Sequence, residues 1–359
     1  MLSVNSGKTK AEVMLFNKLT FDKHKVYPAL VVSTVSSGKS TLINALVGAE
    51  YLPSSGIACT ARAIAILDND RKAEFEAHIV NTEGKYNIIG SVNQKVIERY
   101  NSKIDISEMI LEGQIKGIKN NKKSLLLIDT PGVNNCMDLT HAAVTKTVLD
   151  TFSEGLILYV MNAQQLCTYD DSNFLDMISL KLKEKSKFKI IFVINRMDLI
   201  DKEKEAPAEL IQNCKRYIEA KGIEDPILIP VSAASALAFK KVLQNEELTE
   251  LEMDDFFRYY KKFRNQSFSL LDYQYVPEKG NLNDVLNVDG NKYSKAEIYG
   301  ALYNTGIPYL ESIIDDTLVW ALKMRAPRIT CKNTDEGSRM KKKSGGIFKS
   351  KLRGIKKEK

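Results

Sequence analysis

A lysine set among small, polar residues follows an apolar stretch near the N-terminus. The segment reads STVSSGKST and runs from Ser33 to Thr41. A strand, a loop of the pattern G-x-x-x-x-G-K-S/T and a helix together surround phosphate groups with backbone N–H donors. Gly38, Lys39 and Ser40 fit this pattern, while Ser33 stands at the position of its first glycine. The segment therefore predicts a phosphate-binding loop.

In such a loop, the lysine reaches the β- and γ-phosphates and the hydroxyl after it ligates Mg²⁺. Lys39 and Ser40 are the residues expected in these two roles. The residues expected to contact the phosphates are Ser36, Ser37, Gly38, Lys39, Ser40 and Thr41.

A carboxylate ends the apolar stretch 125–128 and opens the sequence DTPG, which runs from Asp129 to Gly132. Asp129 is expected to hold Mg²⁺ through a water molecule, and the N–H of Gly132 to contact the γ-phosphate. Positioning and charge neutralisation by such groups are the main needs of phosphoryl transfer.

The sequence NRMD, from Asn195 to Asp198, ends the apolar stretch Ile190–Ile194. A carboxylate such as Asp198 can accept hydrogen bonds from the N1–H and 2-amino groups of guanine, which adenine lacks. A site built around such a pair rejects the base that leaves it unpaired. Asn195 is expected to bind the nucleotide, and Arg196 to lie over the base.

A fourth segment, SAA, begins at Ser232 after the apolar stretch Ile227–Val231. Backbone N–H groups of Ser232 and Ala233 are expected to bind the guanine carbonyl. All four segments follow apolar stretches, and α/β sheets bind their ligands at the carboxyl ends of their strands. Together they predict a GTP-binding site.

Apolar stretches alternate with stretches of helical period over the first 240 residues. This alternation predicts an α/β fold with a doubly wound, mostly parallel sheet. Phe75–Val80 and Asn81–Tyr86 are expected to form an added edge hairpin. The expected strands are Val26–Ser33, Ala63–Leu67, Phe75–Val80, Ser124–Ile128, Gly155–Met161, Lys189–Asn195 and Ile227–Val231; the expected helices are Ser40–Gly48, Leu139–Phe152, Asp171–Lys185 and Glu203–Lys221.

The stretch Leu237–Ser294 is polar and rich in aromatic residues and shows no clear period, so an irregular elaboration is expected there. Two helices, Lys295–Tyr303 and Ile307–Leu322, are expected after it. The aromatic residues within the stretch belong either to the core or to a surface for a partner: Phe256, Phe257, Tyr259 and Tyr260.

Composition and charge exclude several classes of protein. The 359 residues are 44% hydrophobic and 27% charged, as in globular proteins with a full core. The net charge of +7 is local, because residues 339–359 carry +9 and the remainder about −2, which disfavours a basic nucleic-acid-binding fold. Five scattered cysteines without a CxxC pair suggest free thiols in a reducing cytosol. We expect neither a transmembrane helix nor a signal peptide.

The run SSGKSTLINALVG at residues 36–48, followed by LPSSGIACTA at residues 52–61, resembles the G domain of dynamin-like GTPases, particularly the bacterial ones. The resemblance extends over about residues 10–240, with a further match at Thr305–Ile314. Small Ras-like GTPases have a short connection where this chain has the long interval from Thr60 to Asp129. That interval also argues against the nearest competitor, an Era-like GTPase.

The resemblance implies roles for further residues. Ser36 would help to position the attacking water and a monovalent cation, K⁺ or Na⁺. Thr60 would bind Mg²⁺ and orient that water. Val133 follows Gly132 where Ras-like proteins have a glutamine, so a homodimer formed across the nucleotide face would supply the missing function. The catalytic residues so implied are Ser36, Lys39, Thr60 and Gly132, and the metal ligands are Ser40, Thr60 and, through water, Asp129.

The resemblance also implies a domain organisation. It consists of an N-terminal helical segment (1–25), a dynamin-like G domain (26–236), an insertion with C-terminal helices packed on that domain (237–325) and a basic, disordered tail (326–359). A dynamin would begin its stalk soon after the last helix. The chain is therefore expected to be truncated, naturally stalkless or one half of a pair with a second dynamin-like or stalk-bearing protein.

The tail at 339–359 has two interpretations. Its apolar residues Phe348, Leu352 and Ile355 recur at helical spacing among basic residues, which favours attachment to an anionic membrane. The alternative is a solvated basic terminus with nonspecific affinity for nucleic acid and no specific nucleic-acid target. We expect a cytoplasmic GTP hydrolase, peripheral to the inner face of the membrane. The rival function is a GTP-binding switch or scaffold with negligible hydrolysis that recruits a protein partner.

Overall fold

The computed structural model describes residues 25–33, 37–53, 64–101, 103, 105–119, 123–129, 154–184, 187–201, 203, 206–265 and 282–325. The chain divides after Met324, and the elements below precede that division, apart from the last residue of the final helix. The expected helix Leu139–Phe152 and tail 326–359 lie outside the described residues, as does the N-terminal segment before Lys25.

Within the described residues, nine strands form one sheet in the order β4-β3-β5-β2-β6-β1-β7-β8-β9. The central strand β1 is parallel to β6 and β7, and β8 and β9 continue in parallel. β2 is parallel to β5 but antiparallel to β6, and β3 is antiparallel to β4 and β5. The mostly parallel α/β sheet is confirmed. Its strands are β1 (Val26–Ser33), β2 (Ile64–Asp68), β3 (Glu76–Asn81), β4 (Tyr86–Ile89), β5 (Ile106–Gly113), β6 (Ser124–Asp129), β7 (Gly155–Asn162), β8 (Phe188–Asn195) and β9 (Ile227–Pro230).

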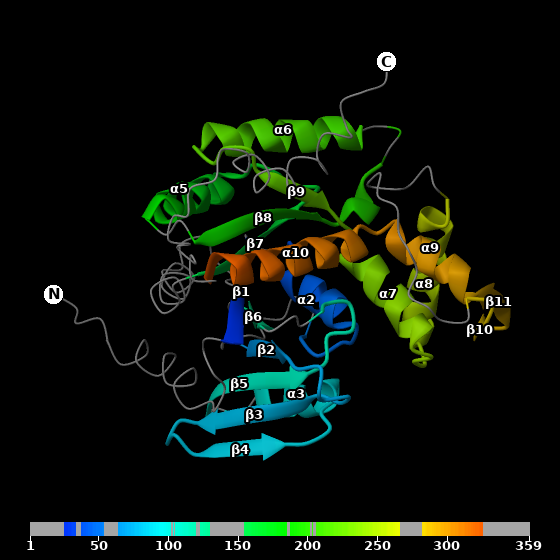
Figure 1. The fold of residues 1–359 in the computed structure, drawn as a ribbon. Helices are drawn as coiled ribbons and strands as arrows, with labels where there is room; N and C mark the ends of the chain where they lie inside the picture. Colours follow the sequence, from blue (N-terminus) through cyan, green and yellow to red (C-terminus); the bar gives the residue numbers. More distant parts are fainter. Residues whose placement is uncertain are drawn as a thin grey trace, which may run out of the picture. The chain divides into compact units, whose positions relative to one another are not determined.

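Helices cover both faces of the sheet (Figure 1). Val31 of β1 belongs to the core cluster shared with α2 (Lys39–Val47), α3 (Gln94–Asn101) and the C-terminal helices. Leu30 belongs to the opposite cluster, with α5 (Tyr169–Glu184) and α6 (Pro207–Ala220). Because β1 is buried on both faces, it is apolar nearly throughout instead of alternating.

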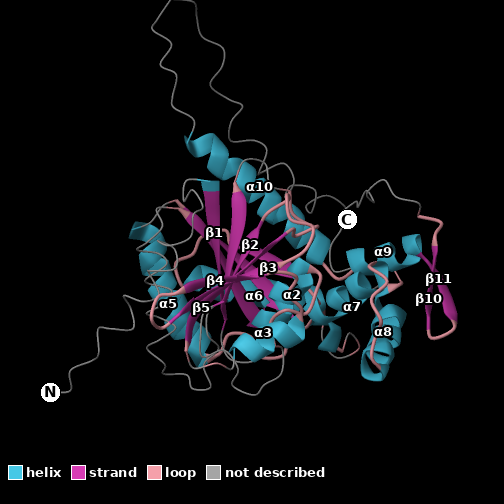
Figure 2. Ribbon diagram, turned by 90° about the horizontal axis from the view of Figure 1, so that it is seen from below, coloured by secondary structure: helices cyan, strands magenta, loops and turns pink. Residues whose placement is uncertain are grey.

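The C-terminal region is more regular than expected. Instead of an irregular elaboration, Leu237–Ser294 contains most of α7 (Ala233–Leu243), all of α8 (Glu250–Phe263) and the hairpin of β10 (Val285–Val288) and β11 (Asn291–Ser294). Figure 1 and Figure 2 both show α7 and α8 gathered with α9 (Lys295–Tyr303) beside that hairpin.

The start of α8 explains why this helix forms. Thr249 and Glu252 make a capping box, in which each side chain accepts a hydrogen bond from the other residue's backbone. Phe256, Tyr259 and Phe263 then recur at helical spacing and are buried. Of the four aromatic residues with two interpretations, Phe256 and Tyr259 therefore belong to the core, and Phe257 and Tyr260 are partly buried against it.

The sheet also differs from the expectation at one strand. β3 and β4 form the expected edge hairpin. β5, which lies between β2 and β3, is a strand that the sequence analysis missed. The last helix, α10 (Ile307–Arg325), is three residues longer than expected. No described helix combines the length and the apolar character needed to cross a membrane.

Candidate functional site

The loop between β1 and α2 is the one that the sequence predicts to bind phosphate. α2 begins at Lys39, and Gly38 before it has a left-handed backbone with φ of 81°. A Cβ atom on residue 38 would lie 2.6 Å from Nδ2 of Asn195, so a side chain here is excluded by space as well as by conformation. Ser40 and Thr41 are half-buried in the first turn of α2, whose N–H groups have no acceptor within the helix.

Lys39 and Asp129 form an ion pair between the start of α2 and the end of β6. Burial raises the pKa of the Asp129 carboxyl group, and the adjacent Lys39 opposes this rise. The second carboxylate oxygen of Asp129, Oδ2, and the hydroxyl of Ser37 are buried without a hydrogen-bond partner among the described residues. Because an unsatisfied buried polar group costs about 1–3 kcal/mol, these atoms fit a place for a polar ligand such as a phosphate with hydrated Mg²⁺.

Asn195 connects three loops at the carboxyl edge of the sheet. It is the last residue of β8 and is buried. Its Nδ2 donates to the carbonyl oxygens of Ser37 and Gly38, at 3.0 and 3.3 Å. Its Oδ1 accepts from the N–H of Ala233 at 3.1 Å. One amide therefore fixes the phosphate-binding loop relative to the segments after β8 and β9.

Asp198 lies in the 3-10 turn η2 (Met197–Leu199). Arg196 precedes this turn and has a left-handed backbone with φ of 66°. The Ser232 hydroxyl donates to Oδ1 of Asp198 at 2.6 Å and lies 2.7 Å from the hydroxyl of Ser235. The carboxylate expected to recognise guanine is therefore already held by the segment after β9.

The backbone N–H groups that the sequence analysis assigned to the guanine carbonyl are both engaged within the protein. The N–H of Ser232 donates to the carbonyl oxygen of Thr305 at 2.9 Å. The N–H of Ala233 donates to Asn195, as described above. Since α7 begins at Ala233, the N–H of Ala234 lies in its first turn and has no acceptor within the helix.

Two residues at this site were missed by the sequence analysis. The ammonium group of Lys262, on α8, donates to the backbone carbonyl oxygens of Asp198 and Ile200. Thr305, in the turn between α9 and α10, accepts from Ser232. Each of these two residues contacts a segment more than sixty residues earlier in the chain, so no local sequence motif marks it.

Three predicted site residues lie outside the described residues, namely Ser36, Thr60 and Gly132. The structure thus brings together Lys39 with Asp129, Asn195 with the phosphate-binding loop, and Asp198 with Ser232.

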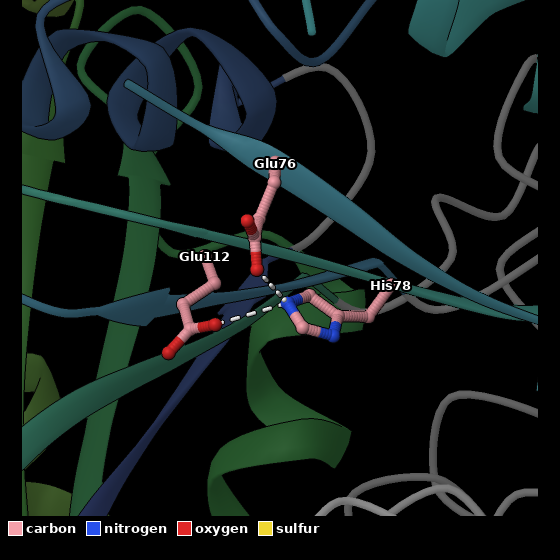
Figure 3. A group of neighbouring side chains, drawn as sticks. All are labelled: Glu76, His78 and Glu112. Carbon is pink, nitrogen blue, oxygen red and sulfur yellow. Dashed lines mark hydrogen bonds and ion pairs between the residues drawn. The ribbon is translucent and has the colours of Figure 1, made fainter. Parts of the chain in front are cut away.

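Figure 3 shows a second polar group, on β3 and β5. Nε2 of His78 lies 2.9 Å from a carboxylate oxygen of Glu76 and 2.9 Å from one of Glu112, an arrangement with three atoms that could ligate a metal. Lys72, however, pairs with both carboxylates, and the Tyr86 hydroxyl lies 2.5 Å from Nδ1 of His78. Because the protein itself supplies cationic and hydrogen-bonding partners, we interpret this group as an ion-pair cluster that joins β3 to β5.

Comparison with known proteins agrees with the motifs. Residues 30–197 match the dynamin family. The chain is 28% identical over 162 residues to a bacterial dynamin-like protein of Nostoc punctiforme, covering 42% of this chain and 22% of that relative. It is 26% identical over 230 residues to the mitochondrial dynamin-like GTPase MGM1 of Saccharomyces cerevisiae, covering 60% of this chain and 25% of that relative. The chain thus spans less than two thirds of these relatives' length.

A solved structure of an oligomerised bacterial dynamin pair, described in connection with long-range sensing and tethering of membranes, aligns with a TM-score of 0.46 and 17% identity. The alignment covers 88% of this chain and 44% of that one. In its motifs and over residues 30–197, this chain is similar to the dynamin-like GTPase family.

Proposed function

We propose that this chain binds GTP together with Mg²⁺ and hydrolyses it. The observation that best supports the proposal is the position of the Asn195 side chain. Its amide links the phosphate-binding loop to the segment that begins at Ala233, and it directly precedes the turn that carries Asp198. Residues suited to a triphosphate and to a guanine base therefore lie at one edge of the sheet.

We also propose a division of the chain into four parts. Residues 26–236 would form the nucleotide-binding G domain, with 237–325 packed on it as an elaboration. Residues 1–25 would form an N-terminal helical segment, and 326–359 a basic tail.

A bound triphosphate would replace the ion pair at the start of α2. Lys39 would leave Asp129 for the β- and γ-phosphates, whose negative charge is greater. Asp129 would then accept hydrogen bonds from the water shell of Mg²⁺, while the hydroxyls of Ser40 and Thr60 would act as direct ligands. Mg²⁺ would neutralise charge on the phosphates.

The base would be read by Asp198, which would exchange the Ser232 hydroxyl for the N1–H and 2-amino groups of guanine. Arg196 would cover the ring. Since the N–H groups of Ser232 and Ala233 are engaged, we assign the guanine carbonyl to the N–H of Ala234.

Hydrolysis would depend on a second copy of the chain. Val133 stands where a glutamine would orient the attacking water, so Ser36, Thr60 and the N–H of Gly132 would have to position it, aided by a K⁺ or Na⁺ ion. We propose that a homodimer across the nucleotide face completes this arrangement.

The rival proposal is a GTP-binding switch that recruits a protein partner and hydrolyses negligibly. Its suggested partner surface included Phe256 and Tyr259, which are buried, so no structural observation favours it.

We further propose that the tail at 339–359 holds the protein to the inner face of an anionic membrane. A second dynamin-like or stalk-bearing protein is the proposed partner.

The experiment that tests the proposal measures GTP and ATP binding, and then turnover, with and without Mg²⁺. Wild-type protein should bind GTP in preference to ATP, and Lys39→Ala should abolish binding and turnover. If the dimer is the active form, the turnover rate should rise more than linearly with protein concentration, so that the specific activity increases with concentration until it saturates. Binding of GTP without turnover at any concentration would support the switch instead, and equal affinity for ATP would contradict the proposed site.

A further inference from the structure

Lys262 lies near the end of α8, on a helix that is firmly held. Its neighbour Phe263 is buried, as is Tyr259 one turn earlier. The carbonyl oxygen of Phe263 accepts a hydrogen bond from Nδ2 of Asn304 at 2.7 Å, so the end of α8 is tied to the turn before α10. The position of the Lys262 backbone is therefore fixed by the buried face of α8 and by this hydrogen bond.

The ammonium group of Lys262 forms hydrogen bonds with the backbone of the turn that carries Asp198. It donates to the carbonyl oxygen of Asp198 and to that of Ile200, the latter at 3.2 Å. Burial lowers the pKa of Lys262, while the charges of Asp198 and Asp201 oppose that shift. The lysine thus supplies both hydrogen bonds and a nearby positive charge.

The two ends of Asp198 are held by different elements. Lys262 holds its backbone from α8, and the Ser232 hydroxyl holds its side chain at 2.6 Å from the segment after β9. A carboxylate can accept hydrogen bonds from two donors of a base only when its distance and angle to both donors are correct. The backbone contact leaves the side chain able to exchange Ser232 for a ligand while the turn stays in place.

We propose that Lys262 is a positioning residue for recognition of the guanine base, acting through the backbone of Asp198. The inference rests on the proposed GTP site and adds to it a determinant of specificity outside the sequence motifs. It assigns to the helix α8 a function in nucleotide selection, beyond its contribution to the core.

The test is calorimetric titration of the full chain with GDP and with IDP, which lacks the 2-amino group. Lys262→Met keeps the apolar stem but removes the donor and the charge, so GDP affinity should fall about tenfold, as for loss of a charged hydrogen bond. The preference for GDP over IDP should fall towards unity. In turnover assays the KM for GTP should rise while kcat stays within about twofold, because the phosphate contacts are unchanged.

Two further variants separate positioning from general stability. Lys262→Arg, which keeps the donors and the charge, should restore most of the GDP preference. Lys261→Met, on the exposed face of the same helix, should behave as wild type. The GDP-to-IDP ratio does not depend on how much of a sample is folded, so a destabilised variant still gives an answer.

An unchanged ratio in Lys262→Met would overturn the inference, even if both affinities fell in parallel. Wild-type protein that binds GDP no better than ADP would instead overturn the proposed function, and this inference with it.

Discussion

The ammonium group of Lys39 and the carboxylate of Asp129 neutralise each other in a place nearly closed to water, since only 6% and 1% of their side-chain surfaces are exposed. A buried ion pair of this kind contributes little net stability, but the loss of one partner leaves an uncompensated buried charge. The pair therefore makes the region where α2 begins beside the end of β6 depend on both residues.

Lys39→Met should destabilise the nucleotide-free protein by about 3 kcal/mol, because the Asp129 carboxylate loses its counter-charge. The double variant Lys39→Met, Asp129→Asn should recover most of this loss, although neither variant should bind GTP. Urea denaturation of the two variants and of wild type measures the difference. Equal stability of the single and double variants would show that the carboxylate does not need its partner.

Asp198→Asn should exchange the base preference from guanine to xanthine. Xanthine has a carbonyl where guanine has its 2-amino group, so an amide that donates can replace a carboxylate that accepts. GDP affinity should fall by more than about tenfold while XDP affinity rises. Titration with both nucleotides measures the exchange, with Lys39→Ala as a control that binds neither. An Asp198→Asn variant that still prefers GDP would remove Asp198 from the base site.

The central strands and the order of the motifs could be predicted from the sequence because they are local. β1 is a continuous apolar stretch and coincides with its expected bounds, Val26–Ser33. β5 was missed because its apolar residues are interrupted by Glu108 and Glu112, and its place between β2 and β3 depends on distant pairing. α8 was missed because four aromatic residues within five positions obscured its helical period.

The site could be predicted only as far as its motifs extend. Asp129 ends β6, and Gly38 and Lys39 come a few residues after β1, so sheet geometry brings them to one edge. The engagement of the Ser232 N–H by Thr305 could not be predicted, because it depends on how the turn after α9 packs. For the same reason no pattern marks Lys262, whose acceptors are backbone oxygens that any residue provides.

Gly306→Ala should destabilise the protein and weaken guanine binding together. Gly306 has φ of 82°, and a Cβ atom there would lie 2.2 Å from the carbonyl oxygen of Pro230. The backbone conformation alone costs about 1–2 kcal/mol for alanine, and the clash would displace the neighbouring Thr305 from Ser232. Gly300→Ala is the matched control, since it lies in α9 with open space around it and should stabilise by about 0.5–1 kcal/mol. Thermal unfolding and GDP titration of both variants measure the two effects. A Gly306→Ala variant with wild-type stability and GDP affinity would contradict the close approach of residue 306 to the carbonyl oxygen of Pro230.

Deletion of residues 339–359 should remove binding to anionic membranes and leave GTP binding unchanged. That segment carries +9, whereas the rest of the chain carries about −2, and every nucleotide motif precedes residue 235. Co-sedimentation with anionic liposomes should fall sharply on deletion, and for the intact chain it should weaken as salt rises. Replacing Phe348, Leu352 and Ile355 by serine tests whether an apolar face contributes. Undiminished co-sedimentation of the shortened chain would place the membrane contact elsewhere.

The cluster on β3 and β5 should make stability sensitive to acid through Glu112. The hydrogen bond from His78 lowers the pKa of Glu112 from 4.5 to about 2; Lys72 and Asn69 add to this effect, and burial opposes it. Because the unfolded chain then binds a proton more readily than the folded one, this contribution is complete above pH 4.5 and is lost as the pH falls towards 2.

Glu112→Gln removes the titrating group, so its free energy of unfolding should fall less steeply over this pH range than that of wild type. It should also be less stable than wild type at neutral pH, because Lys72 and His78 lose an anionic partner. Glu83→Gln, in the exposed turn between β3 and β4, is the matched control and should keep the wild-type slope. Urea denaturation at several pH values measures all three slopes. Parallel slopes for Glu112→Gln and wild type would mean that the carboxylate is not stabilised by its neighbours, whatever their distances.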